Sequence, residues 1–238
     1  MCLLTNKMSK RINSDSNGSA VYMSCDDKLL SHEKSLWERG FSFVGGIDEA
    51  GRGCMAGPVV AACVIFTDPG KIPAGLNDSK LLSHNQRMEL RERLLAEESV
   101  RYAVAEVDAN EIDCINILKA TWKAMAKAAE ALKELQTVLV DGNPVKGLPV
   151  PSQNLIKGDS LSASIAAASI LAKTHRDLVM VEAAKEFPQY GFEIHKGYCT
   201  KMHDEALKQY GPCRLHRMSY APVQRILFEQ GFEQGELF

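Results

Sequence analysis

The chain has 238 residues, of which 45% are hydrophobic and 24% charged, and its formal net charge is −2. This composition is that of an ordinary globular protein and excludes fibrous and disordered classes. The length suits one large domain, or one domain with an appendage. The small net charge gives no overall attraction for a polyanion, so a nucleic-acid surface would need local clusters of Lys and Arg.

The seven cysteines are widely spaced and contain no Cys-x-x-Cys pair, which argues against a disulfide framework and favours a reducing compartment. The first residues lack the continuous apolar core of a signal peptide, and no apolar run is long enough for a membrane helix. We therefore expect a cytoplasmic protein with no membrane partner. The polar, Ser- and Asn-rich segment 1–25 is expected to be a disordered tail.

The first half of the chain alternates helical and extended patterns. Hydrophobic periodicity and turn residues predict a short helix at 27–39, a strand at 43–48, a strand buried on both faces at 58–66, a charged helix at 83–98 and a strand at 101–107. The first two strands are expected to pair.

The second half continues this alternation. Asp108 and Glu111 resemble a helix-capping pair, and apolar residues recur at steps of three and four from Ile112 to Leu135, which predicts one helix of roughly six turns. Strands are predicted at 137–141 and 153–156, and a helix rich in small residues at 160–186. Alternation without a clean βαβ repeat favours an α/β fold, with a mixed sheet and helices on both sides.

Two adjacent carboxylates, Asp48 and Glu49, end the first strand and precede the turn Gly51-Arg52-Gly53. Carboxylates are costly to desolvate, so a cation is expected beside them. The glycines allow close approach of a ligand, and the arginine can donate to phosphate oxygens. Because neighbouring strand residues point to opposite faces, the two acids can share a site only if the chain turns at that point. The alternative interpretation is a solvated turn after a strand.

Two further acids occupy similar places, Asp141 at the end of a strand and Asp159 before the small-residue helix. Taken singly, Asp141 could be a turn residue and Asp159 a helix cap. Taken with Asp48 and Glu49, they form a set of acids at element ends without matching buried bases. Such a set favours Mg²⁺ or Mn²⁺, and a pair of these ions is suited to in-line attack on a phosphodiester.

The C-terminal third interleaves basic residues with tyrosines, a pattern that suits nucleic acid, although a solvated helical face is the alternative. The basic residues are Lys196, Lys201, Lys208, Arg214 and Arg217. Five nearby residues could also be considered zinc ligands, but their spacing matches no common structural zinc pattern. They are His195, Cys199, His203, Cys213 and His216.

Seven ordered blocks between about residues 36 and 223 resemble type 2 ribonuclease H, ribonuclease HII. They are GIDEAGRG at 46–53, AGPVVAA at 56–62, NDSK at 77–80, DGN at 141–143, KGD at 157–159 with SASIAAASI at 162–170, HKGY at 195–198 and HR at 216–217. The resemblance implies the ribonuclease H-like fold, with a central mixed five-stranded sheet flanked by helices. It places the catalytic domain at 26–190 and a small helical C-terminal extension, which contributes to substrate binding, at 191–238.

The resemblance also implies a function. Asp48, Glu49, Asp141 and Asp159 would hold two Mn²⁺ or Mg²⁺ ions, and the enzyme would cut the phosphodiester 5′ to ribonucleotides in RNA–DNA hybrids or duplex DNA. The products would carry 3′-hydroxyl and 5′-phosphate ends. Gly51, Arg52 and Gly53 would recognise the 2′-hydroxyl, and Tyr198 would stack on the sugar at the RNA–DNA junction. Lys80 and Lys173 would contact phosphates, although both could equally be surface residues. We expect a monomer.

The chain departs from the family pattern at Cys54-Met55, where a Pro-Leu pair is usual. Activity should survive, because neither replaced residue would bind metal, although a thiol could lie near the site. The N-terminal segment is too short for the extra domain of ribonuclease HIII. Two alternatives remain: a catalytically silent nucleic-acid-binding module on the same fold, which the four acids disfavour, and a zinc-stabilised interaction domain.

Overall fold

The computed structural model describes residues 4–5, 27–76, 79–229 and 231. In this part of the chain a mixed sheet has the strand order β1-β4-β3-β2-β5-β6. The strands are β1 (Leu4–Thr5), β2 (Val44–Ala50), β3 (Val59–Phe66), β4 (Val100–Val107), β5 (Thr137–Asp141) and β6 (Ser152–Leu155). Strands β2, β3 and β4 are antiparallel neighbours, whereas β5 runs parallel to β2 and β6 parallel to β5. The predicted mixed sheet of five strands is therefore confirmed in β2 to β6.

The short strand β1 is an addition that the sequence analysis did not foresee. Residues 4–5 lie within the segment predicted to be a disordered tail, yet they pair antiparallel with Ala103 and Val104 of β4. Strand β4 would otherwise present an edge of unpaired backbone groups, which is a ready template for another strand. The rest of the predicted tail lies outside the described residues.

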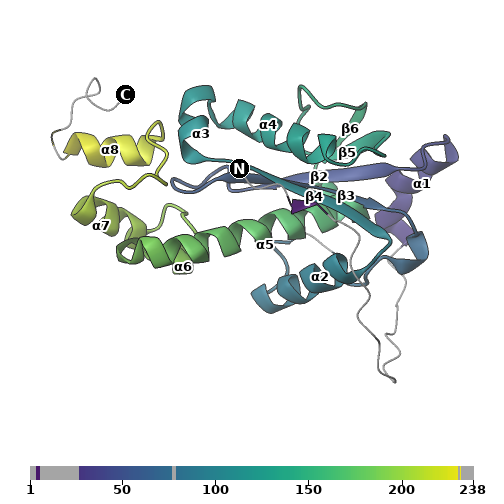
Figure 1. Ribbon diagram of the computed structural model, residues 1–238, viewed down its shortest axis with the longest axis horizontal. Helices are drawn as coiled ribbons and strands as arrows, with labels where there is room; N and C mark the ends of the chain where they lie inside the picture. Colours follow the sequence, from purple (N-terminus) through teal and green to yellow (C-terminus); the bar gives the residue numbers. More distant parts are fainter. Residues whose placement is uncertain (1–3, 6–26, 77–78, 230, 232–238) are drawn as a thin grey trace.

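Helices cover both faces of the sheet (Figure 1). One face carries α2 (His84–Ala96) and α5 (Ala163–Glu186), and the other carries α3 (Ala109–Ile115) and α4 (Ile117–Glu130). Alternate residues of β3 enter the two cores: Val60 and Val64 face α5, while Ala61 and Ile65 face α4. This confirms the strand buried on both faces.

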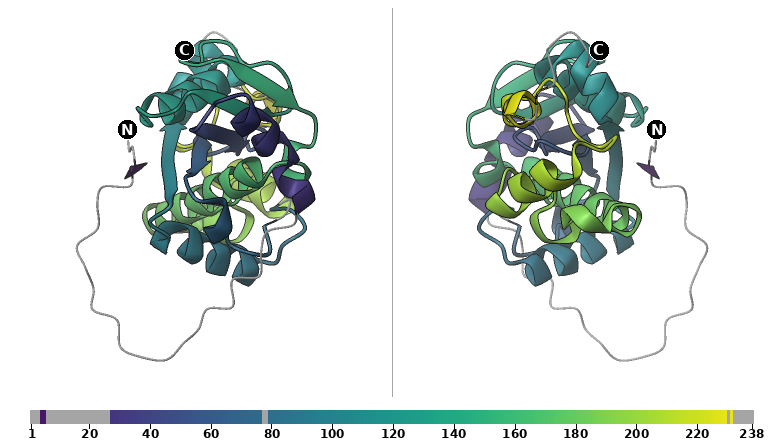
Figure 2. Two further views of the ribbon diagram at one scale, coloured as in Figure 1. Left: turned by 90° about the vertical axis from the view of Figure 1, so that its right-hand side faces the viewer. Right: turned by 90° about the vertical axis from the view of Figure 1, so that its left-hand side faces the viewer.

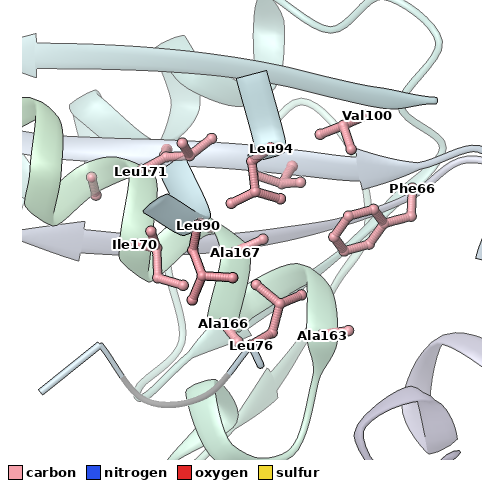
Figure 3. Close-up of a cluster of buried hydrophobic side chains, with 14 of the residues drawn as sticks. Phe66, Leu76, Leu90, Leu94, Val100, Ala163, Ala166, Ala167, Ile170 and Leu171 are labelled. Atoms are coloured by element: carbon pink, nitrogen blue, oxygen red, sulfur yellow. The ribbon is translucent and has the colours of Figure 1, made fainter. Parts of the chain in front are cut away.

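The core between the sheet and α5 is built largely from small side chains (Figure 3). Ala166, Ala167 and Ile170 of α5 meet Leu90 and Leu94 of α2. Strand and helix approach closely at Gly46, where a Cβ atom would lie 2.2 Å from the backbone of Ser164. Helix α5 therefore rests directly on β2, the strand that carries Asp48 and Glu49.

The remaining helices lie at the two ends of the sheet (Figure 1, Figure 2). The 3₁₀ segment η1 (Asp27–Leu30) and α1 (Ser31–Glu38) occupy one end. The other end carries η4 (Pro188–Tyr190), α6 (Phe192–His195), α7 (Lys201–Tyr210) and α8 (Ala221–Glu229), so the small helical C-terminal part is confirmed. Two further 3₁₀ segments are η2 (Pro69–Lys71) and η3 (Gly158–Ser160). No helix in the described ranges has the length and hydropathy needed to cross a membrane.

The single helix predicted from Ile112 to Leu135 is wrong. Asn116, with a φ of 67°, separates α3 from α4, and its side chain accepts a hydrogen bond from the backbone N–H of Lys119 to start the second helix. Leu118 of the predicted stripe is 45% exposed. Steps of three and four continue across one non-helical residue, so periodicity alone could not show the break, although Asn tolerates a positive φ. The predicted cap at Asp108 is confirmed.

Helix α5 begins at Ala163, later than predicted. Ser162 is its N-cap, accepting a hydrogen bond from the backbone N–H of Ile165. Asp159 instead lies in the short segment η3, so the alternative of Asp159 as the helix cap is wrong. The cap is itself held by a buried carboxylate, because Glu33 of α1 accepts hydrogen bonds from the hydroxyls of Ser162 and Ser164, each at 2.6 Å.

Candidate active site

Four carboxylates converge at the end of the sheet where β2 and β5 finish. The parallel register pairs Ile47 with Val140, which places Asp48 and Asp141 on neighbouring strands at the same level. Asp48 is only 8% exposed. Burial raises its pKa well above the usual range, and the charges of Glu49, Asp141 and Asp159 raise it further. The set that the sequence analysis assembled from separate elements therefore occupies one electrostatic site.

Asp48 and Glu49 reach one site from the last residues of their strand. Strand β2 stays extended through Ala50, which pairs with Val60, and the chain turns only at Gly51. Asp48 and Glu49 nevertheless border the same hollow. The turn expected at Gly51-Arg52-Gly53 follows directly, because the strand ends one residue after Glu49 and side chains of both faces reach the sheet edge there.

Each carboxylate has a partner within the protein. The backbone N–H of Glu49 donates to Asp48 Oδ1 at 2.7 Å, and that of Gly158 donates to Asp141 Oδ1 at 2.6 Å. Arg52 lies 3.2 Å from Glu49 Oε1, and Lys80 Nζ lies 3.7 Å from Asp159 Oδ2. Burial raises the pKa of Glu49, and Arg52 opposes that shift. Asp48 forms no ion pair with any described residue.

The donor chemistry of the site fits a divalent cation. All four side chains offer carboxylate oxygens, the ligands that Mg²⁺ and Mn²⁺ prefer, and no cation among the described residues compensates the buried Asp48 carboxylate. Among the described residues, no three His, Cys, Asp or Glu side chains are grouped tightly enough to hold a metal ion as they stand. A bound cation would therefore compete with Arg52 for Glu49 and with Lys80 for Asp159.

The Gly51-Arg52-Gly53 turn is anchored by its backbone. The Arg52 carbonyl accepts hydrogen bonds from Arg217 Nη1 at 3.0 Å and from the Tyr220 hydroxyl at 2.7 Å, which leaves the Arg52 side chain about half exposed beside Glu49. Gly51 has a φ of 96°, and a Cβ there would lie 2.1 Å from Arg176 Nε. Gly53 has no atom within 4 Å of its Cβ position. Packing thus requires Gly51, whereas the space at Gly53 is open to a ligand.

Two buried arginines, Arg176 and Arg217, support this turn; the sequence analysis named Arg217 only as part of a basic patch and of a family block, and missed Arg176. Arg176 donates to the carbonyls of Pro58, Ala56 and Lys196, at 2.9, 2.9 and 2.8 Å. Arg217 donates to the carbonyls of Gly57 and Arg52. Neither has a carboxylate partner in the described part of the chain, so their charges stay unneutralised beside the turn. A charged residue inside the apolar helix 163–186 was the available signal for Arg176.

Tyr198 lies in the loop between α6 and α7 and is 41% exposed. The Nζ of Lys173 lies 5.1 Å and the guanidinium carbon of Arg176 5.8 Å from the centre of its ring. A hollow of about 240 Å³, which we call the Tyr198 hollow, joins this ring to the carboxylates. Its lining includes most of the predicted site residues: Asp48, Glu49, Gly51, Arg52, Lys80, Asp141, Lys173 and Tyr198.

The Cys54 thiol lies fully buried next to Tyr198, so a thiol does lie near the site as the sequence analysis suggested. Burial raises the pKa of this thiol, with Arg176 and Arg217 opposing the shift. Met55, the other departure from the family pattern, packs with Leu207 and Val223 in the core of the C-terminal helices.

The three histidines considered as zinc ligands are engaged in hydrogen bonds. The backbone N–H of Cys213 donates to His216 Nδ1, so His216 Nε2 carries the proton and donates to His203 Nε2 at 3.0 Å. His203 Nδ1 then donates to the Tyr198 carbonyl at 3.0 Å. His195 Nδ1 accepts from the backbone N–H of Gly197. These rings hold the loop that carries Tyr198.

The basic residues of the C-terminal third do not form one unpaired patch. Lys201, Lys208 and Arg214 form ion pairs with Glu205, Glu229 and Glu186. Lys196 donates to the carbonyl of Glu193, and Arg217 is buried. The alternative of a solvated helical face therefore describes Lys201 and Lys208 of α7, whereas Arg214 lies in the turn between α7 and α8.

Comparisons with known proteins agree with this architecture. The family model described as Ribonuclease HII matches residues 45–223. The ribonuclease HII of Caldanaerobacter subterraneus subsp. tengcongensis is 50% identical over 202 residues, which cover 84% of this chain and 82% of that protein. The ribonuclease HII of Chlamydia pneumoniae is 44% identical, with coverage of 83% and 92%.

Solved structures of related enzymes share the fold. The ribonuclease H2 of Pyrococcus horikoshii OT3 superposes with a TM-score of 0.65 at 26% identity and covers 79% of this chain and 98% of its own. The ribonuclease HII of Archaeoglobus fulgidus, solved in complex with PCNA, gives a TM-score of 0.63 at 28% identity, with coverage of 75% and 95%. A ribonuclease HIII in complex with Mn²⁺ has the same fold at 19% identity and a TM-score of 0.65. By its family match, its relatives and its fold, the chain belongs to the ribonuclease HII family.

Proposed function

We propose that Asp48, Glu49, Asp141 and Asp159 are the catalytic and metal-binding residues of this enzyme. The protein is a metal-dependent endoribonuclease that cleaves RNA in RNA–DNA hybrids and at embedded ribonucleotides. The observation that carries the residue assignment is the buried Asp48 carboxylate, whose pKa is raised by burial and by three neighbouring carboxylates, and which pairs with no cation in the described part of the chain. Two Mn²⁺ or Mg²⁺ ions, when bound, would supply an activated water and stabilise the departing 3′-oxygen.

The chain's own residues would select the bond that is cut, the phosphodiester 5′ to a ribonucleotide. The open space at Gly53 and the anchored backbone of Gly51 and Arg52 support a contact with the ribose 2′-hydroxyl. The guanidinium of Arg52 can donate to a phosphate in place of Glu49. The products would carry 3′-hydroxyl and 5′-phosphate ends.

Tyr198 and the lysines would bind the nucleotides that follow. The exposed Tyr198 ring can stack on the sugar at the RNA–DNA junction, and Lys173 and Arg176 beneath it add positive charge. Lys80 and Lys173 line the same hollow and would contact phosphates. Tyr198 belongs to the C-terminal helical part, which the sequence analysis placed at 191–238. This part would therefore contribute to substrate binding beside the catalytic domain 26–190.

The five described cysteines are free, which supports a cytoplasmic location. The monomeric state stays a prediction.

The test is cleavage of a duplex that carries one embedded ribonucleotide, with and without Mn²⁺. We expect cutting on the 5′ side of the ribonucleotide only when the metal is present. The Asp48→Asn variant should bind the duplex but not cut it. A wild-type protein that binds without cutting under any divalent metal would favour the silent binding module instead, and loss of binding together with cleavage in Asp48→Asn would assign Asp48 a structural role.

A further inference from the structure

A second hollow borders the same carboxylates on the opposite face of the sheet. It has a volume of about 120 Å³ and shares Glu49, Arg52 and Asp141 with the Tyr198 hollow. Its other wall comes from α4, with Trp122, whereas Lys173 of the Tyr198 hollow belongs to α5. Helices α4 and α5 cover opposite faces of the sheet (Figure 1), so the two hollows flank the carboxylates that they share. We call the second one the Trp122 hollow.

The walls of the Trp122 hollow offer what a nucleotide requires. Trp122 provides an aromatic face, and beside the hollow, next to its lining residue Val145, the Nζ of Lys146 lies 5.7 Å from the centre of the Trp122 ring. Leu118, 45% exposed, adds an apolar edge. The turn after β5 supplies the exposed Asn143, whose carbonyl accepts a hydrogen bond from Asn154 Nδ2 at 2.9 Å, so this rim is tied to β6. Aromatic rings interleaved with basic residues bind single nucleotides by stacking and by contact with phosphate.

We propose that the Trp122 hollow is the subsite for the nucleotide 5′ to the cut, the one that keeps the 3′-hydroxyl. This inference rests on the proposed function. The carboxylates hold the reacting phosphate, and the ribonucleotide and the junction sugar occupy the side of the Gly51-Arg52-Gly53 turn and Tyr198. A continuous strand that crosses Glu49 and Asp141 from that side leaves over Trp122. Trp122 contacts the sugar and base of the upstream nucleotide, and Lys146 its 5′ phosphate.

Intrinsic fluorescence tests this assignment, because the chain contains two tryptophans. Trp37 packs against the core clusters under α1, and its replacement in Trp37→Phe leaves Trp122 as the only tryptophan that fluoresces. A second substitution, Asp48→Asn, prevents cleavage during the titration. The double variant is titrated with two duplexes. In one, the ribonucleotide-bearing strand starts at the ribonucleotide with its 5′ phosphate; in the other, two deoxynucleotides precede it.

Trp122 fluorescence should be quenched by the longer duplex and not by the shorter one. Binding of each duplex is followed separately, by the fluorescence anisotropy of a dye on the distal DNA end. Equal quenching by both duplexes would overturn the proposal, as would binding of the longer duplex without any quenching. Because these measurements need no cleavage, they report on the subsite alone.

Kinetics provide the second test, on a duplex with upstream deoxynucleotides. Trp122→Leu and Lys146→Gln should each raise KM by about five- to tenfold, with kcat within about twofold, since a stacked base contributes at least a fivefold effect. The Lys146 side chain is exposed, so its variant preserves the fold. Lys71→Gln removes an exposed charge after the opposite end of β3 and should leave KM unchanged.

The two proposals fail in different ways. A wild-type enzyme that does not cut the duplex refutes the proposed function. An enzyme that cuts, but whose KM is unchanged by Trp122→Leu and by Lys146→Gln, refutes the upstream subsite and leaves the catalytic assignment intact.

Discussion

The imidazoles of His203 and His216 share a hydrogen bond of 3.0 Å between their Nε2 atoms, and this bond requires that at least one ring be neutral. Both rings are buried. Burial lowers the pKa of His203 to about 3 and the pKa of His216 to about 4. The relay ends on the backbone carbonyl of Tyr198, so the protonation state of two core histidines is linked to the position of a proposed substrate-binding residue.

Acid should therefore destabilise the folded protein through these histidines. An unfolded histidine titrates near pH 6.5, so below that pH the unfolded state binds more protons than the folded state. The stabilisation is complete above about pH 6.5 and is lost as the pH falls towards 4. We expect the unfolding free energy to decrease by about 1.4 kcal/mol per pH unit for each histidine in this window. Urea unfolding between pH 7 and pH 4.5 measures it, and the double variant His203→Gln, His216→Gln should show a shallower slope; an identical slope would contradict the prediction.

Removal of the Asp48 charge should stabilise the metal-free protein. A carboxyl group whose folded pKa is raised favours the folded state when protonated at low pH and destabilises it once ionised, so at pH 7 its charge opposes folding. Asp48→Asn should raise the unfolding free energy in EDTA by about 1 kcal/mol or more. Asn can still accept the hydrogen bond from the Glu49 N–H. Thermal unfolding in EDTA measures this, and a less stable variant would contradict it.

Divalent metal should reverse that order. At about 100 times its Kd, Mn²⁺ would stabilise the wild type by about 2.7 kcal/mol, because it binds the folded state. Asp48→Asn should gain much less stability, since the variant lacks the carboxylate proposed as the central ligand. Thermal unfolding with and without Mn²⁺ gives both numbers, and EDTA should restore the metal-free values. Equal stabilisation of the two proteins would show that Asp48 does not contact the ion.

The two glycines of the turn should respond differently to alanine. Gly51→Ala places a Cβ against Arg176 and forces a positive φ on a residue that resists it, so we expect a loss of about 2–4 kcal/mol in stability. Gly53→Ala adds a methyl group in open space and should change stability by less than about 0.5 kcal/mol. If Gly53 contacts the ribose, its variant should nevertheless raise KM several-fold. Denaturant unfolding and steady-state kinetics on the same two variants separate packing from recognition.

Arg176→Lys should weaken both the fold and the proposed binding surface. Lysine keeps the charge but lacks the planar guanidinium that donates to the carbonyls of Ala56, Pro58 and Lys196. The unfolding free energy should therefore fall by about 2–4 kcal/mol. Arg225→Lys is the matched control, because Arg225 pairs with Asp204 at the surface. This variant should change the unfolding free energy by less than about 0.5 kcal/mol. Similar losses in the two variants would show that the buried fork at Arg176 has no special role.

Much of this molecule could be predicted from local patterns. Strand β3 could be recognised because a run of apolar residues suits a strand with two buried faces. The helix cap at Asp108 could be recognised because a capping side chain bonds to the backbone only three residues away. Asp48, Glu49, Asp141 and Asp159 could be grouped because each lies where an element ends, and ends of neighbouring strands meet at one edge of a sheet. These features depend on interactions within a few residues of the chain.

The remaining features depend on contacts between distant segments, which local patterns do not encode. The break at Asn116, the extension of β2 past Glu49 and the pairing of residues 4–5 with β4 are decided by where neighbouring elements lie. Arg176 meets Ala56 across 120 residues and Lys196 across 20, and no periodicity marks such a partner in advance. The sequence alone thus determined most of the elements and the acidic residues at their ends. Tertiary packing alone decided how the turn, the arginines and the histidines hold the proposed substrate-binding residues in place. Buried polar groups must form hydrogen bonds, and the fold determines which distant residues become their partners.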